Sequence, residues 1–408
     1  MTTTEATSDW KLLTAHLPAG WEELAGEMGL IRARPAHLGV KILHIGQILR
    51  LVLHQAGTSS SLRATTALAA ATNVVTLAAV SLHKWMVKLG PYLTELLARM
   101  VEVSAFAPAK WGGLHVIAGD ATTVQRPGSK GTTARVHYAL RLADLSPRHI
   151  EVTDEHGGET ARRFRAEPGE VWLLDRAYAN PAGVAAIRNS GAHIIVRYNR
   201  GTLPLYDKLG NRIDVMSLLR TKGNRGQAYQ RRAFVHIMGK GSVVAQRIPG
   251  RLCWLRIPEN KVEQALQRAK REAEGACDAE TLEIAEYVVL FTTILEELTA
   301  AEVLALYGAR WQIELEFKRS KSIRELDRLP NFLPETIHSW ICAKLLLQLI
   351  THRIAAPTGA FPPGGTSFNL LPDVGAKAAP RPRGRRAMVR HESGLEDGMR
   401  HAVAHCAA

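Results

Sequence analysis

The chain has 408 residues, of which 46% are hydrophobic and 22% are charged, so it is long and apolar enough for two or three globular units. Its 52 lysines and arginines exceed its 38 acidic residues, and the resulting net charge of +14 favours a polyanionic partner such as nucleic acid. The four cysteines show no C-x2-C spacing, which argues against a zinc ribbon or a disulfide framework and fits a reducing cytosol.

Residues 1–110 are predicted to form an all-helical N-terminal domain. Helical periodicity runs through 37–53, 62–71 and 80–89. A short connection at Thr72–Asn73 allows a helix-turn-helix in which Ser81–Lys88 reads DNA. An ordinary helical bundle explains the same Ala- and Leu-rich pattern, so both interpretations stay open.

From residue 111 to residue 198 the pattern changes to strands. LHVIAGD, RVHYALRLAD and HIEVTDE are three strand candidates, followed by a helix candidate at Gly158–Arg165. A buried strand VWLLD, a helix at Pro181–Asn189 and the strand HIIVRYN complete the order βββαβαβ. That order is typical of an RNase H-like core, a mixed α/β fold whose strand ends can hold clustered carboxylates.

The second half of the chain is predicted in three parts. Residues 199–285 carry short alternating runs and read as a β-rich insertion, and 286–355 return to the core with a strand at Tyr287–Thr293 and C-terminal helices. The apolar run Trp340–Ile354 is too short to span a bilayer, so no membrane is expected. Residues 356–408 have Pro and Gly clusters without periodicity and are predicted to be a disordered basic tail.

The stretch Thr299–Arg324 is predicted to be one long helix that begins with a T-x-x-E capping box. At roughly 100° per residue, four of its side chains fall within an arc of about 60°. These are Tyr307, Arg310, Glu314 and Lys321, and Lys318 lies on the same arc. Such a stripe is commonly a solvated face of ion pairs. Glu314 lies between Ile313 and Leu315, however, so a core-facing carboxylate that needs a partner or a metal is also plausible.

Two aspartates follow apolar strand candidates, Asp120 in GDATT and Asp175 in LLDRAY. Carboxylates from separate elements can hold two divalent cations, which is the requirement for metal-assisted phosphodiester cleavage. Oxygen ligands without a His/Cys cluster favour Mg²⁺, with Mn²⁺ as a substitute. The acidic group Glu151, Asp154 and Glu155, with His156, is interpreted as a solvated strand end and not as a second metal site.

The spaced motif Y-x2-R-x3-E-x6-K, together with Asp120-Ala121-Thr122 and Asp175-Arg176-Ala177-Tyr178, resembles the signature of the DDE insertion-sequence transposases, in particular the insertion-sequence-four family. The resemblance implies that Asp120, Asp175 and Glu314 are catalytic and hold two Mg²⁺ ions. It implies DNA contacts for four further residues, namely Tyr307, Arg310, Lys318 and Lys321. It also implies that the helical N-terminal domain recognises the ends of the element and that the β-rich insertion covers the active site.

The activity that this resemblance implies is metal-dependent cleavage at the ends of an insertion sequence and strand transfer, with a hairpin intermediate. The partners would be double-stranded DNA, as terminal inverted repeats and target, and a second copy of the chain in a homodimer on DNA. The location would be the bacterial cytoplasm, at the nucleoid. Two alternatives remain: a nuclease on the same fold that cuts without joining, and a non-catalytic DNA-binding remnant of an element.

Overall fold

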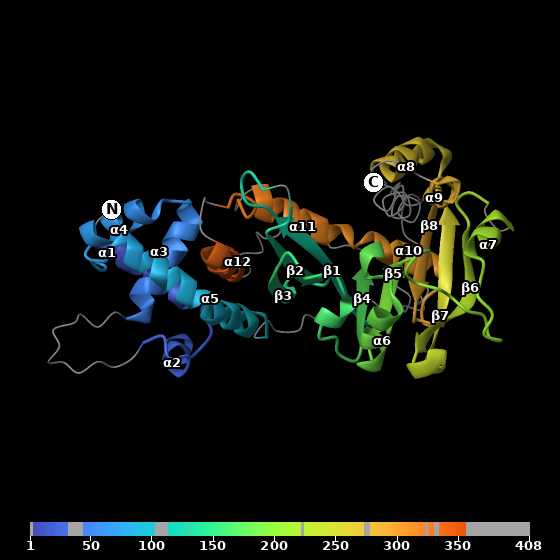
Figure 1. The fold of residues 1–408 in the computed structure, drawn as a ribbon, viewed down its shortest axis with the longest axis horizontal. Helices are drawn as coiled ribbons and strands as arrows, with labels where there is room; N and C mark the ends of the chain where they lie inside the picture. The colour runs from blue at the N-terminus through green and yellow to red at the C-terminus, as the bar shows by residue number, and fades with distance from the viewer. Residues whose placement is uncertain are drawn as a thin grey trace, which may run out of the picture.

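A mixed eight-stranded sheet with the order β3-β2-β1-β4-β5-β8-β7-β6 lies beside a body of helices in the computed structural model (Figure 1). The structure describes residues 3–31, 44–102, 113–129, 131–221, 224–272, 278–322, 325–329 and 334–355. The predicted tail 356–408 and the start of the helical period at 37–53 lie outside the described residues. The strands are β1 (His115–Val124), β2 (Ala134–Arg141), β3 (Pro147–Asp154), β4 (Glu170–Leu174), β5 (His193–Arg197), β6 (Ala228–Met238), β7 (Val244–Arg256) and β8 (Tyr287–Thr292).

The first five strands confirm the predicted mixed α/β class with an RNase H-like core. β1, β2 and β3 form an antiparallel meander, and β4 and β5 add to β1 in parallel. The crossover between β4 and β5 contains α6 (Pro181–Asn189), whose N-terminus is capped by the Asn180 side chain. Strand β4 is buried on both faces, since Trp172 packs into one core and Leu173 into the other. A strand covered on both faces needs a continuous apolar run, which is what its sequence shows.

The helix predicted at Gly158–Arg165 is wrong. The structure has only a single 3-10 turn there, η2 (Ala161–Arg163). Phe164 follows in an extended conformation, and its ring stacks on Trp172 with the centroids 4.8 Å apart. Burial of this aromatic ring against β4 stabilises the extended backbone and overrides local helix propensity.

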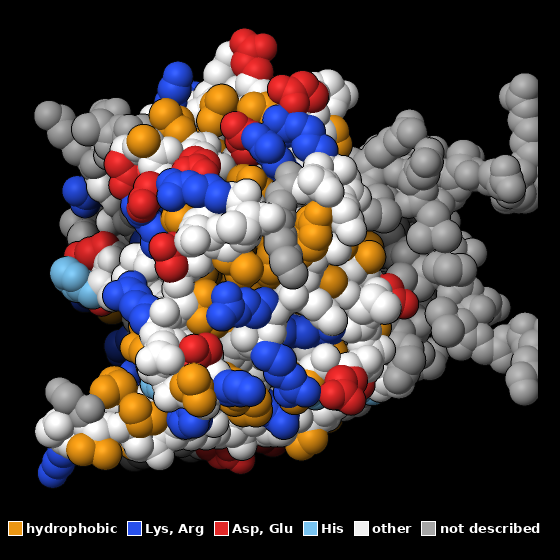
Figure 2. Space-filling model, turned by 90° about the vertical axis from the view of Figure 1, so that its right-hand side faces the viewer, with side chains coloured by type: hydrophobic (Ala, Val, Ile, Leu, Met, Phe, Trp, Pro, Cys, Tyr) orange, Lys and Arg blue, Asp and Glu red, His pale blue; other side chains and the backbone are white. Residues whose placement is uncertain are grey.

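The strands of the β-rich segment extend the sheet. β6 and β7 make an antiparallel hairpin, and β7 pairs with β8, which in turn pairs with β5. Three strands separate β6 from β4, whereas α8 (Glu259–Glu272) of the same segment carries Arg268, whose charge acts on Asp175. Covering of the active site by the segment 199–285 stays a prediction. Lys and Arg side chains gather on the face at this end of the molecule (Figure 2). Exposed basic residues of the hairpin strands include Arg231, Arg232 and Arg247.

The segment 299–324 is not one helix. It forms α10 (Ala300–Gly308), which begins with the predicted Thr299–Glu302 capping box, and α11 (Trp311–Ser322). At the junction the backbone N–H groups of Ala309, Arg310 and Gln312 bond three residues back, so the helix tightens into a 3-10-like turn. α10 packs on β6 and β7 while α11 packs on β1 and β2, so the junction lies over the middle of the sheet.

The helical body contains the N-terminal helices and also the last helix of the described chain. Its members are α1 (Thr3–Thr14), α2 (Trp21–Glu27), α3 (Ile45–Thr58), α4 (Leu62–Ala71), α5 (Ala79–Glu102) and α12 (Pro334–Ala355). One hydrophobic core joins α12 to α3 and α5, and α12 also contacts β3. The last helix therefore packs with the N-terminal body. The domain limits predicted from the sequence had placed it with the core, in residues 286–355.

The segment predicted as a DNA-reading helix lies inside the long helix α5. Leu82 and Met86 of this segment are fully buried in the helical core, whereas Lys84 and Lys88 are exposed. The connection from α4 spans residues 72–78 and is longer than the predicted Thr72–Asn73 turn. The packing is that of a bundle, and the reading role of Ser81–Lys88 stays a prediction. None of the helices in the described residues is long and apolar enough to cross a bilayer.

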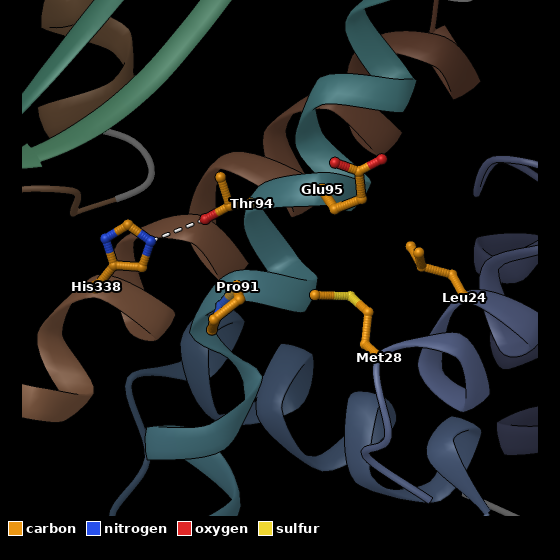
Figure 3. A pocket seen from close by; sticks show the side chains of 6 residues that line it. All are labelled: Leu24, Met28, Pro91, Thr94, Glu95 and His338. Atoms are coloured by element: carbon orange, nitrogen blue, oxygen red, sulfur yellow. Dashed lines mark hydrogen bonds between the residues drawn. The ribbon is translucent and has the colours of Figure 1, made fainter.

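A pocket opens in the helical body between α2, α5 and α12 (Figure 3). It is lined by Leu24, Met28, Pro91, Thr94, Glu95 and His338. The Thr94 hydroxyl and His338 Nε2 are 2.9 Å apart, and Glu95 forms an ion pair with Arg99. The one carboxylate that lines the pocket, Glu95, is thus already paired, and the pocket lies apart from Asp120 and Asp175.

Candidate active site

Asp120 and Asp175 occupy matching positions on neighbouring parallel strands. Gly119 of β1 pairs with Leu174 of β4 at the last position of their ladder, and each aspartate is the next residue. Neighbouring strands lie about 4.8 Å apart, so the two carboxylates lie side by side where the ladder of β1 and β4 ends. β1 itself continues to Val124 in its ladder with β2, so the predicted strand LHVIAGD is too short and Asp120 lies within β1. Gly119 permits this approach, because a Cβ atom there would lie 2.8 Å from Leu174 Cδ2.

Arg310 joins Asp120 to Glu314. Its Nη1 atom lies 3.1 Å from Asp120 Oδ2, and its Nη2 atom lies 2.6 Å from Glu314 Oε1. The Arg310 side chain is only 11% exposed, Asp120 is 18% exposed and Glu314 is 44% exposed. The turn between α10 and α11 thus places one guanidinium between a carboxylate of the sheet and a carboxylate of the helix, and the site opens towards solvent at Glu314.

The two aspartates differ in their affinity for protons. The pKa of Asp120 is raised to about 7, because burial, together with the charge of Asp175, outweighs the opposing Arg310 guanidinium. Burial also acts to raise the pKa of Asp175, but Arg310, Arg197 and other positive groups outweigh it and hold the pKa below its ordinary value. Two adjacent carboxylates resist joint ionisation, so Asp175 carries the negative charge more readily than Asp120.

The donor set fits a hard divalent cation. Asp175 Oδ1 is buried and has no hydrogen-bond partner in the described part of the chain, which is costly for a carboxylate oxygen without a ligand. Asp120 and Asp175 supply adjacent oxygen ligands of the type that Mg²⁺ prefers. Among the described residues, no three His, Cys, Asp or Glu side chains are grouped to surround one ion. Arg310 lies between Asp120 and Glu314, so each of these two carboxylates contacts the guanidinium and not the other carboxylate.

The remaining predicted residues lie at different depths. Tyr307 is 2% exposed, and its hydroxyl donates to the carbonyl oxygen of Leu174 over 3.3 Å. Its ring is therefore not open to a nucleotide in this conformation, and the predicted stacking is not favoured. Lys318 is exposed and Lys321 is half-buried on α11, one and two turns beyond Glu314. Arg310 lies inside the carboxylate group, away from the surface that the prediction assumed.

Two further groups belong to this site and were not predicted. Glu159 has its pKa raised by burial and by the charge of Asp175, and its Oε1 atom lies 3.7 Å from Arg135 Nε. The buried hydroxyl of Tyr178 has no partner within the described residues, and burial and the nearby acids raise its pKa. Tyr178 ends the D-R-A-Y motif and could have been suspected from that spacing, whereas Glu159 has no signal in the sequence.

Glu316 and the acidic group of β3 have structural roles. Glu316 is buried on α11, accepts a hydrogen bond from Gln348 of α12 and lies 3.6 Å from Arg319. Glu151 pairs with Arg163 at 2.7 Å at the β3 edge. Among the described contacts, neither Glu151 nor Glu316 is bonded to Arg310. The candidate site therefore consists of the carboxylates around that guanidinium.

Comparison with known proteins identifies the family. Residues 111–349 match the family described as the transposase DDE domain. The transposase for insertion sequence element IS421 of Escherichia coli is 30% identical over 366 residues, which cover 87% of this chain and 96% of that protein. The putative transposase InsL for insertion sequence element IS186A of Escherichia coli strain K12 is also 30% identical over 365 residues, with the same coverage. The match spans β1 to α12 and includes every residue of the site, and the chain belongs to the DDE-type insertion-sequence transposases.

Proposed function

We propose that this chain cleaves DNA at the ends of its own insertion sequence and joins the freed ends to target DNA. Asp120, Asp175 and Glu314 are the catalytic carboxylates of this proposal. The observation that supports it best is that Asp120 and Asp175 lie side by side where the parallel ladder of β1 and β4 ends, with Glu314 tied to Asp120 through Arg310. Strand transfer is favoured over cleavage alone by the named transposases that align with nearly the whole chain.

The same three carboxylates would hold two Mg²⁺ ions, for which Mn²⁺ can substitute. When bound, such ions activate the attacking water or 3′-hydroxyl and stabilise the leaving oxygen. Asp175, whose charged form is favoured, and Asp120, which yields its proton near neutral pH, provide the negative charge for them. Lys318 and Lys321 then neutralise phosphates of the bound strand on the open side of α11.

Tyr307 positions the site from its buried side in this proposal. Its hydroxyl holds the carbonyl of Leu174, the residue before Asp175, and so fixes the strand end from which that carboxylate projects. The N-terminal helical body would recognise the inverted repeats, and a homodimer would pair the two ends of the element in the bacterial cytoplasm, at the nucleoid. A hairpin on the element end is the intermediate that we propose between cleavage and joining.

Glu314→Gln tests the proposal, because it keeps the shape of the side chain and removes its charge. We expect end-DNA binding to persist and Mg²⁺-dependent cleavage to fall by a factor of about 100 or more. The measurement is a gel assay with a labelled element end that resolves nicked, hairpin and joined products. Cleaved product without any joined product, from the unsubstituted chain, would favour the nuclease alternative.

Glu283→Gln is the matched control. Glu283 is also a partly exposed glutamate, and it is paired with Arg220 at 2.6 Å on the far side of the sheet. We expect its cleavage rate to stay within about twofold of the unsubstituted chain. Full cleavage by the Glu314 variant, or equal losses from both substitutions, would remove Glu314 from the site. Glu316 is unsuitable as a control because it is buried against Gln348.

A further inference from the structure

The guanidinium of Arg310 occupies a position between two carboxylates that is suited to a cation. Its two terminal nitrogens contact Asp120 Oδ2 at 3.1 Å and Glu314 Oε1 at 2.6 Å. The two nitrogens of a planar guanidinium are about 2.3 Å apart, so the two carboxylate oxygens lie within about 8 Å of each other. We propose that Arg310 is a built-in counter-ion that competes with a divalent cation for Asp120 and Glu314 and must leave them before that cation binds. The proposal rests on the metal-holding role assigned to these carboxylates above.

The surroundings of Arg310 explain why its charge stays in place. A buried charge is tolerated only when it is paired, and Arg310 makes two charge-assisted hydrogen bonds to carboxylates from different elements. It also lies close enough to Asp175 for the two charges to affect each other, and the Tyr307 ring centroid is 5.8 Å from its guanidinium carbon. Arg310 therefore offsets part of the negative charge of three carboxylates and links β1 to α11.

A divalent cation between the same carboxylates meets this positive charge directly. Like charges a few ångströms apart repel each other strongly in a site that is shielded from water. Both cations also need the same oxygens, since Asp120 Oδ2 and Glu314 Oε1 each accept from Arg310. Occupation by one therefore weakens binding of the other, and Arg310 lowers the affinity of the chain for the metal.

The open side of the site gives the displaced side chain a destination. Glu314 is 44% exposed, and Lys318 follows it by one turn on the exposed side of α11. A guanidinium that leaves Asp120 on this side reaches the surface on which we expect a DNA phosphate. Phosphate, like carboxylate, binds a guanidinium through two parallel hydrogen bonds. Metal and DNA would then strengthen each other, because each favours the displaced position of Arg310.

Mn²⁺ titration of the full chain without DNA, followed by electron paramagnetic resonance, tests this competition. We expect Arg310→Gln, which removes the charge and keeps a polar side chain, to bind Mn²⁺ with a dissociation constant lower by a factor of about ten or more. Arg319→Gln removes the same charge from α11, the helix that follows Arg310, where the side chain pairs with Glu316 at 3.6 Å. That control should bind Mn²⁺ within about twofold of the unsubstituted chain.

Equal or weaker Mn²⁺ binding by Arg310→Gln would overturn the counter-ion role. If that variant does not fold by circular dichroism, Arg310→Met replaces it, because methionine is also uncharged and its flexible side chain fills the buried position. Tighter Mn²⁺ binding by the methionine variant supports the role, and unchanged binding overturns it.

The outcome separates this inference from the proposed function. If the unsubstituted chain cleaves element ends with Mn²⁺ and Arg310→Gln binds Mn²⁺ no more tightly, only the counter-ion role is wrong. If Asp120→Asn added to Arg310→Gln leaves Mn²⁺ binding unchanged, these carboxylates are not the metal site and both proposals fail.

Discussion

At the scale of single residues, the site depends on small or uncharged groups that support the carboxylates. Gly119 leaves room for the side chain of Leu174, and Phe164 lies against the same position. His137 of β2, opposite Ala121 of β1, is fully buried and bonded through Nε2 to the Thr153 hydroxyl at 3.1 Å. None of these residues carries charge to the reaction, yet each fixes the strand that bears Asp120.

Gly119→Ala is expected to destabilise the fold and to reduce cleavage. The added methyl carbon would lie 2.8 Å from Leu174 Cδ2 and 3.2 Å from Phe164 Cζ, so the side chains of Leu174 and Phe164 must shift beside the residue before Asp120. Overpacking of this kind costs about 1–3 kcal/mol. Urea unfolding followed by circular dichroism measures the change. Gly131→Ala is the control, because a Cβ atom there meets nothing within 4 Å, and equal losses from the two variants would contradict the packing explanation.

His137 is expected to make the fold sensitive to acid. Its pKa is lowered to about 4, mainly by burial and in addition by the nearby Arg163. Between that value and the ordinary value near 6.5 the unfolded chain binds more protons, so stability present at pH 7 is lost as the pH falls through this window. Compared with His137→Asn, the unsubstituted chain should lose up to about 3 kcal/mol more between pH 7 and pH 4.

Chemical denaturation at a series of pH values measures that difference. His156→Asn serves as the control, since His156 is 84% exposed at the end of β3 and its loss should leave the acid sensitivity unchanged. A stability difference between the chain and His137→Asn that does not vary with pH would exclude His137 as its source.

At the scale of elements, the junction of α10 and α11 is the feature that assembles the site. α10 ends at Gly308, and the turn that follows bonds three residues back, so Arg310 reaches Asp120 of β1. Ile313 lies about 100° from Glu314 around α11 and is buried against the sheet, which holds Glu314 at the boundary with solvent. The helix pair therefore places the charge of Arg310 inside the site and the charge of Glu314 at the side that opens to solvent.

Tyr307→Phe tests the contact between this helix pair and β4. Removing the hydroxyl that donates to Leu174 leaves a buried carbonyl without that partner, and stability should fall by about 0.5–1.5 kcal/mol. The DNA dissociation constant should stay nearly unchanged, because the ring is buried. Thermal unfolding and fluorescence anisotropy with an element end measure the two quantities. Lost DNA binding at unchanged stability would instead restore the predicted nucleotide contact, and Tyr229→Phe, whose hydroxyl donates to Gln227, is the control.

At the scale of the whole molecule, the last helix of the described chain packs against the N-terminal helices. α12 packs between α3 and α5, and the same core reaches Val124 and Val136 of the sheet. The helical body and the strands that carry Asp120 are thus connected by packing as well as by the chain. A helix that follows Glu314 completes the core of the N-terminal helices, so we expect the two parts to fold together.

Trp340→Ala is expected to loosen both parts. The indole of Trp340 is fully buried in this shared core, and replacing a buried tryptophan with alanine costs about 3–5 kcal/mol. Limited proteolysis should then cut within the N-terminal helices as well as near residue 340. Ile354→Ala, at an exposed position of the same helix, should leave the digestion pattern unchanged. Cleavage confined to α12 in the Trp340 variant would show that the N-terminal helices are stable without it.

The sequence by itself determined the mixed α/β class, the apolar strands that lead to Asp120 and Asp175, and the motif that contains Glu314. These features are local, because apolar runs specify strands. The continuation of β1 beyond Asp120 to Val124 was not predicted, since it depends on pairing with β2. Tertiary structure alone decided that the insertion joins the sheet, that α12 completes the N-terminal core, and that Arg310 lies between carboxylates 190 and 4 residues away from it. Strand partners, helix docking and ion pairs depend on contacts between distant segments, and a periodic pattern specifies which face of an element is buried but not what covers it.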